Sequence, residues 1–155
     1  MPKSILTSFV QDLVKGLGLD IDLEDSPSYT LEIQDKAVQL ELDDTGDFIF
    51  VSTVIGKVPS GMYRESVLEQ ALLSNGYPPP QFGYFGYDLN QDILVLHQRF
   101  HVTKLTKKTL MDAIPGFIQM STDWGRAIGS ASVPIAAKPD PSQAPSILEI
   151  MGIKT

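Results

Sequence analysis

The chain lacks cysteine and has no long apolar run, and each absence excludes a class of function. Without cysteine there is no disulfide, no thiolate nucleophile and no cysteine-ligated metal, and a reducing compartment is permitted. The longest uncharged stretch, residues 70–87, holds three prolines and three glycines and predicts no membrane span. Gln11, Asp12 and Lys15 interrupt the first apolar segment, which therefore does not resemble an export signal. We expect a cytosolic protein, and 155 residues fit one domain.

Basic residues are scarce in the N-terminal third of the chain. Residues 1–47 carry eleven acidic side chains against Lys3, Lys15 and Lys36, a balance of −8, whereas residues 48–155 have a balance of +1. Nucleic acid requires a basic surface, so we exclude it as a partner. The acidic balance favours basic or neutral partners instead.

Apolar spacing predicts a helix and then three strands. Residues 4–17 repeat apolar side chains every three or four positions, with Ser4 as the N-cap. Residues 29–33 and 38–42 alternate apolar and polar side chains, which is typical of strands with one face in water. Residues 48–58 predict a third strand that is apolar on both faces at its start. Short turns, one of them at Asp35-Lys36, join the three strands into an antiparallel meander.

The second half of the chain predicts a helix, a hairpin and a long helix. Residues 63–74 predict a helix that Asn75-Gly76 stops. Strands at 82–87 and 93–100 form a hairpin that is apolar on both faces, so each face needs a cover. A helix from about Thr106 to Ile128 follows, and Pro115 is expected to kink or divide it. The fold class is therefore α+β, an antiparallel β-sheet with helices in the order α-β-β-β-α-β-β-α.

The end of the chain has a different composition. We expect residues 1–128 to form the single domain and residues 129–155 to form a flexible proline-rich tail. A short apolar patch at residues 146–151 would dock on this domain or on a partner.

Two turns resemble sites of chemistry but have a simpler explanation. Residues 88–92 begin like a calcium loop, yet Ile93 and Arg99 stand where glycine and glutamate are needed. Asp44-Thr-Gly is the aspartic-protease tripeptide, but it is surrounded by other acidic residues and lacks the dry cleft that this chemistry needs. Both are best explained as polar turns.

The two histidines are the natural residues to consider for a metal. His97 and His101 share one face of a strand, but no third ligand lies nearby in sequence. We therefore predict no metal, no cofactor and no catalytic residue.

The chain has more apolar side chains at predicted helix and strand positions than a single two-layer domain can bury. The first helix, the third strand and the hairpin carry them on more than one face, whereas a two-layer domain covers only one face of its sheet. The excess favours a second covering surface, either a dimer partner or a bound polypeptide.

The order of elements and the segment 82–128 together resemble a known family. Gly86-Tyr-Asp88 is followed by the apolar strand Ile93–Arg99 and by a helix with a late tryptophan, Trp124. In this, residues 4–128 resemble the Tir-chaperone (CesT-like) family of class I type III secretion chaperones. Small size, acidic balance and the lack of cysteine also fit, whereas the proline-rich tail and Pro115 depart from the family pattern.

The resemblance implies a homodimeric chaperone of the bacterial cytoplasm that works without ATP. It would bind the N-terminal segment of a secreted effector in extended form, with the secretion apparatus as a further possible partner. The implied partner-binding residues are Phe9, Leu13, Leu17, Leu31, Ile33, Val38, Leu40 and Phe50. The implied dimer interface consists of Val67, Leu68, Ala71, Leu72, Ile93 and Val95.

Two other functions stay open from the sequence. One is a small hydrolase or ligand-binding domain that uses Asp44 or the two histidines, His97 and His101. The other is an adaptor that binds folded partners on the same fold.

Overall fold

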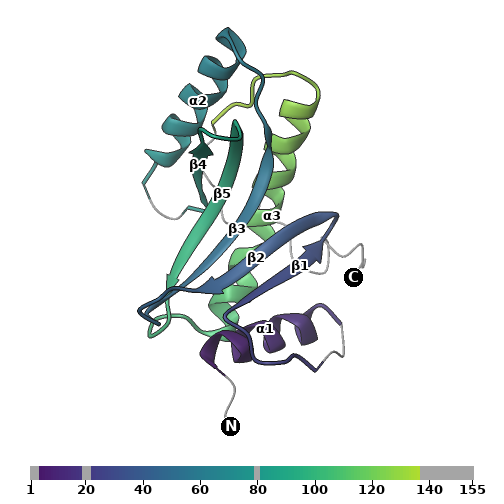
Figure 1. Cartoon of the computed structure of the whole chain (residues 1–155), viewed down its shortest axis with the longest axis vertical. Coiled ribbons are helices and arrows are strands. Elements are labelled where there is room, and N and C mark those ends of the chain that lie inside the picture. The colour runs from purple at the N-terminus through teal and green to yellow at the C-terminus, as the bar shows by residue number, and fades with distance from the viewer. Residues whose placement is uncertain (1–3, 19–21, 79–80, 137–155) are drawn as a thin grey trace.

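A computed structural model describes residues 4–18, 22–78 and 81–136, which form a five-stranded antiparallel sheet with three helices (Figure 1). In chain order the elements are α1 (Ile5–Gly16), β1 (Ser28–Ile33), β2 (Lys36–Leu42), β3 (Phe48–Lys57), α2 (Met62–Asn75), β4 (Tyr84–Asp88), β5 (Ile93–His101) and α3 (Lys107–Gly129). The predicted fold class and element order are confirmed.

The strands are arranged in the order β1-β2-β3-β5-β4, so β1 and β4 are the edges of the sheet. Gln34 and Asp35 join β1 to β2, and both have positive φ (49° and 65°). That is the geometry of a two-residue type I′ hairpin, one residue earlier than the sequence suggested. Gly46 also has positive φ (78°), in the turn before β3.

Helix α3 covers one face of the sheet. Its side chains Ile114 and Phe117 are buried against the sheet, and the centre of the Trp124 ring lies 4.0 Å from that of Phe85 on β4. The helix continues through Pro115 as one element of 23 residues, so of the two expected effects of that proline, a kink or a division, the division does not occur. Lys108, near the unfavourable N-terminal end of α3, forms an exposed ion pair with Asp112 at 3.4 Å.

Helix α1 packs on the same side of the sheet, against α3 and β2. The Ser4 hydroxyl caps it by accepting a hydrogen bond from the backbone N–H of Thr7 at 3.2 Å. The buried hydroxyl of Thr7 also lies 2.7 Å from the Tyr29 hydroxyl on β1 and donates to Asp25. One side chain therefore ties α1 to the connector and to the edge strand.

Helix α2 lies beside β4, at the opposite end of the molecule from α1 (Figure 1). The side-chain amide of its last residue, Asn75, forms hydrogen bonds with both backbone groups of Phe85. The Phe85 N–H donates to Asn75 Oδ1 at 2.7 Å, and Asn75 Nδ2 donates to the Phe85 carbonyl at 2.9 Å. At the other end of α2, Arg64 donates to the Val58 carbonyl and pairs with Asp92 at 3.3 Å. These contacts fix α2 to the edge of the sheet.

The chain after α3 returns along α2. Tyr63 donates a hydrogen bond to the Ser132 carbonyl at 2.8 Å, and the N–H of Ala136 donates to Gln70 Oε1 at 2.9 Å. Pro134 is buried between these contacts. The predicted tail therefore begins with a segment that is bonded to the domain, whereas the apolar patch at 146–151 lies outside the described residues.

Candidate functional site

The sheet has one face that α3 does not cover. Cross-strand register places on it the pairs Phe48–His101, Phe50–Arg99, Val54–Val95 and Tyr84–His97, because residues directly opposite in an antiparallel pair share a face. We call this the open sheet face: Phe48, Phe50, Ser52, Val54, Tyr84, Val95, His97, Arg99 and His101. Val54 is its most exposed aliphatic residue, with 55% of its surface accessible.

Aromatic and basic side chains alternate at one end of the open sheet face. The rings of Phe48 and His101 meet edge to face, 4.9 Å apart, and the Arg99 guanidinium lies 4.5 Å from the centre of the Phe48 ring. A cation over an aromatic face is attracted by the ring quadrupole. The arrangement suits binding through apolar and charged contacts.

The residues considered for catalysis are not assembled into a site. Burial lowers the pKa of His97, while His101 shares a hydrogen bond with Thr103 through Nδ1. Asp44 is exposed in the turn before β3. Within the described ranges no three histidine or acidic side chains lie close enough to hold a metal ion.

A second surface lies at the other end of the chain's core, where α1 meets β1. Ile5 is 41% exposed, and Phe9, Leu23 and Leu31 are only partly buried against the core. We call these four residues the N-terminal surface. The Thr7 hydroxyl, bonded to Asp25 and in contact with the Tyr29 hydroxyl, links α1 to the connector and to β1, the elements that carry this surface.

The predicted partner-binding residues divide between the core and two surfaces. Phe9 and Leu31 belong to the N-terminal surface, and Phe50 lies on the open sheet face. The others are at most 8% exposed and form the chain's own core: Leu13, Leu17, Ile33, Val38 and Leu40. Their periodicity reflects packing of α1 and α3 on the sheet, and their side chains are not accessible to a partner in this fold.

The predicted dimer residues divide in the same way. Val67 and Ala71 are buried in the core, so their side chains cannot contact a second copy of the chain directly. Leu68 is half-buried and Leu72 is 72% exposed on α2, whereas Ile93 and Val95 are half-buried on β5. Leu72 and Val95 are therefore available to a partner.

The predicted site residues did not include three residues that bear on these surfaces. Val54 belongs to the open sheet face, Ile5 to the N-terminal surface, and Asn75 closes the outer edge of β4. The alternation in β3 could have marked Val54. No local feature of the sequence indicates that Asn75 caps the edge of β4 in addition to ending the helix.

Comparison with known proteins decides the family. The profile of the Tir chaperone protein (CesT) family matches residues 8–125, which is well over half of the chain. The chain belongs to this family. The search among curated proteins found no match.

Solved structures of low sequence identity share the fold. The type III secretion chaperone SycH of Yersinia pestis, solved with a fragment of YscM2, has a TM-score of 0.60 and 14% identity, over 76% of this chain and 97% of that one. The ExsC–ExsE complex gives a TM-score of 0.61 and 14% identity, over 81% and 95%. The ExoU–SpcU heterodimer of the Pseudomonas aeruginosa type III secretion system gives 0.60 and 13%, over 81% and 98%.

These matches confirm the resemblance and the function class inferred from the sequence, a type III secretion chaperone of the CesT-like family. The family is one of chaperones, SycH was solved with a fragment of YscM2, and another matched structure is the HopA1–SchA chaperone–effector complex. Within the described part of the chain, no helix combines the length and the apolar character needed to cross a bilayer.

Proposed function

We propose that this chain is a homodimeric chaperone of the bacterial cytoplasm that holds the N-terminal segment of a secreted effector in extended form, without ATP. Family membership over residues 8–125 is the observation that carries the proposal. Holding a segment unfolded requires no chemistry, only a surface that competes with the segment's own tendency to fold. The two partly apolar surfaces of the fold supply candidates for it.

The effector segment is assigned to the N-terminal surface. Phe9 and Leu31 present half-buried side chains from a helix and from an edge strand, and in the described part of the chain β1 pairs only with β2. An extended peptide gains affinity by pairing with a free edge and placing alternate side chains in apolar depressions. Such binding is tolerant of sequence, which suits a chaperone.

The dimer contact is assigned to α2 and the adjoining part of the open sheet face. Leu72 is 72% exposed and Val54 is 55% exposed, and both would bury apolar surface against a second copy. Asn75 closes the edge of β4 at Phe85, so we expect the two copies to meet through side chains and not by pairing β4 with β4.

The first experiment tests effector binding. The chain is purified from its native host with its bound proteins, these are identified by mass spectrometry, and the protected segment is mapped by limited proteolysis. We expect an N-terminal segment, and we expect Phe9→Asp and Leu31→Asp each to weaken its binding about ten-fold or more. Ser8→Asp is the matched control, since Ser8 is an exposed neighbour on α1. Recovery of folded proteins that bind by surface patches, with both variants unaffected, would favour an adaptor instead.

The second experiment tests the dimer. The chain has a mass of 17.0 kDa, and light scattering should report about twice this value at micromolar concentration for the wild type. Leu72→Asp combined with Val54→Asp should yield monomers. Leu89→Asp should not, because Leu89 is equally apolar and 81% exposed but lies in the β4–β5 turn. A wild type that stays monomeric across the micromolar range contradicts the assignment.

A further inference from the structure

Strand β5 extends beyond the end of its outer neighbour. The last β4–β5 pair is Tyr84 with His97, whereas β5 continues to His101. The chain before Tyr84 does not continue the β4–β5 pairing. On its outer side, the last part of β5 therefore has no strand neighbour among the described residues.

The backbone of Arg99 faces this vacant edge. Val102 donates a backbone hydrogen bond to Asp47 at 2.9 Å, which continues the β3–β5 ladder. Since bonded and non-bonded pairs alternate in an antiparallel ladder, the N–H and C=O of Arg99 point away from β3. The N–H of Arg99 indeed donates to the side chain of Gln98, at 3.3 Å.

The Gln98 side chain partly closes the vacant edge. Its Oε1 accepts the long bond from the Arg99 N–H, and its Nε2 donates to the Gln81 carbonyl at 3.0 Å. A single amide side chain thus takes the place that a strand would occupy. A 3.3 Å bond near the limit of good geometry is readily exchanged for a backbone bond to an incoming strand.

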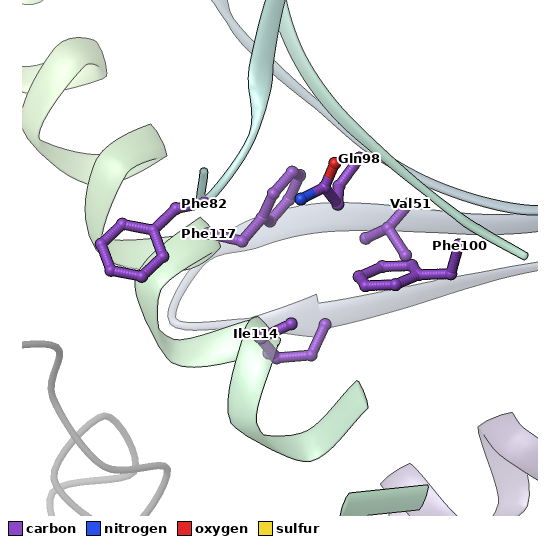
Figure 2. A pocket seen from close by; sticks show the side chains of 7 residues that line it. Val51, Phe82, Gln98, Phe100, Ile114 and Phe117 are labelled. Carbon is purple, nitrogen blue, oxygen red and sulfur yellow. The ribbon is translucent and has the colours of Figure 1, made fainter. Parts of the chain in front are cut away.

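An apolar depression lies directly beside this edge, on the α3 side of the sheet. Figure 2 shows its lining, which consists of Val51, Phe82, Gln98, Phe100, Ala113, Ile114 and Phe117. It is shallow, with about 160 Å³ of empty space that includes open solvent. Phe82 is half-buried at its rim and rests against Gly116, where a Cβ would lie 2.4 Å from the ring.

Basic residues are frequent in the sequence at and after the end of β5, in a chain whose net charge is −7, although Asp47 lies opposite Val102 and Lys108 is paired with Asp112. Residues 99–108 contain Arg99, Lys104, Lys107 and Lys108 and no acidic residue. Arg99 and the three lysines are exposed, and Arg99 is held over Phe48 on the open sheet face. The Arg99 guanidinium on the open sheet face favours an acidic side chain at the position that pairs with it.

We propose that the end of β5 is a docking site for an extended, acidic segment of the effector, which pairs with Arg99 and places an apolar side chain in the depression. Successive side chains of an added strand point to opposite faces. The residue paired with Arg99 lies on the open sheet face beside the guanidinium, and its neighbours point toward Phe82 and Phe100. The site therefore selects an acidic residue next to an apolar one. This inference rests on the proposed function, since it assumes that an extended polypeptide is the ligand, but it concerns a surface apart from the N-terminal surface.

Synthetic peptides test the site without knowledge of the effector. Two fluorescein-labelled dodecapeptides are compared by anisotropy, one alternating glutamate and leucine, the other alternating lysine and leucine. We expect the glutamate peptide to bind the wild type at least ten-fold more tightly than the lysine peptide. Ala113→Phe, which fills the depression, should weaken that binding at least ten-fold, whereas Gln119→Phe should not. Gln119 is the matched control because it is exposed on α3 outside the depression.

Two variants separate pairing from charge. Arg99→Ala removes the guanidinium and keeps the N–H, whereas Arg99→Pro removes both, at an edge position where proline is tolerated. We expect Arg99→Pro to weaken the glutamate peptide more than Arg99→Ala does. Amide shifts in the NMR spectrum of the wild type should localise at Arg99 and His101 when the peptide is added, which does not depend on any variant folding.

The outcomes distinguish this inference from the proposed function. Equal affinity for both peptides, no binding of the glutamate peptide, or amide shifts that avoid the end of β5 would overturn the docking site. If an effector then still binds in a way that Phe9→Asp abolishes, the proposed function stands and only the site at β5 is lost. If no effector segment binds the wild type at all, the proposed function fails, whatever the peptides do.

Discussion

The side chain of Asn75 should determine whether the outer edge of β4 is closed. It makes two hydrogen bonds to Phe85, one to the N–H at 2.7 Å and one to the carbonyl at 2.9 Å. Phe85 lies opposite Leu96 of β5 in the register. Its backbone N–H and C=O, however, point to the outer side of β4, where Asn75 forms hydrogen bonds with both. Asn75→Ala removes both bonds and leaves two partly buried backbone groups to water.

The magnitude follows from the number of bonds. Each hydrogen bond contributes about 0.5–1.5 kcal/mol net, so Asn75→Ala should lower the free energy of unfolding by about 2 kcal/mol. For a domain of this size, 1 kcal/mol corresponds to about 2–4 °C in Tm. Calorimetry should therefore record a fall of about 4–8 °C. Asn90→Ala, an exposed asparagine in the β4–β5 turn, should change Tm by less than about 2 °C.

Hydrogen exchange gives the sharper assay. The Phe85 amide is protected by Asn75, whereas the Tyr84 amide faces β5, so Asn75→Ala should accelerate exchange at Phe85 far more than at Tyr84. The opened edge should also raise the tendency to associate, seen as larger species in light scattering. Unchanged Tm together with unchanged protection of Phe85 would refute the assignment of Asn75 as the cap of this edge.

Two further predictions concern the N-terminal half. Thr7→Val keeps the shape of the side chain but removes the hydroxyl that contacts Asp25 and Tyr29, so chemical denaturation should show a loss of about 1–3 kcal/mol; a variant as stable as the wild type would contradict the role of this cluster. Burial opposes ionisation of Asp43, but bonds from Phe48, Thr45 and other donors outweigh it and hold the pKa of that carboxyl below its usual value. A lowered folded-state pKa stabilises the fold above the unfolded pKa, and this contribution is lost as the pH falls through the folded pKa. The stability difference between wild type and Asp43→Ala should therefore shrink on acidification, and a difference independent of pH would exclude this cause.

The sequence predicted the elements well because their patterns are local. The alternation in residues 29–33 and 38–42 and the stripe of residues 4–17 each depend on a few neighbouring side chains, and each matches the observed strand or helix. Pro115 was misjudged because a proline inside a helix loses one bond and causes a local clash, while burial of Ile114, Phe117 and Trp124 stabilises the helix on both sides of it.

The surfaces were harder to predict because they depend on distant partners. Phe50 and Val51 are adjacent apolar residues in β3, and nothing local distinguishes them. Register with β5 places Val51 opposite Gln98, under α3, and Phe50 opposite Arg99, on the open sheet face. A residue more than forty positions later thus decides which of the two is available to a partner.

The same register explains how the apolar side chains of the open sheet face can stay exposed to water. Phe48 is half-buried, because the Arg99 side chain lies over its ring and His101 meets its edge. Such contacts are worth about 0.5–1 kcal/mol at exposed sites, so they cover the ring in the free chain but are weak enough to be rearranged by a partner. A tightly packed aliphatic cover at the same place would protect the ring equally well but would have to be displaced at a cost of several kcal/mol. Cationic and aromatic residues across from Phe48 and Phe50 therefore cover this surface in water without fixing it in one packed arrangement.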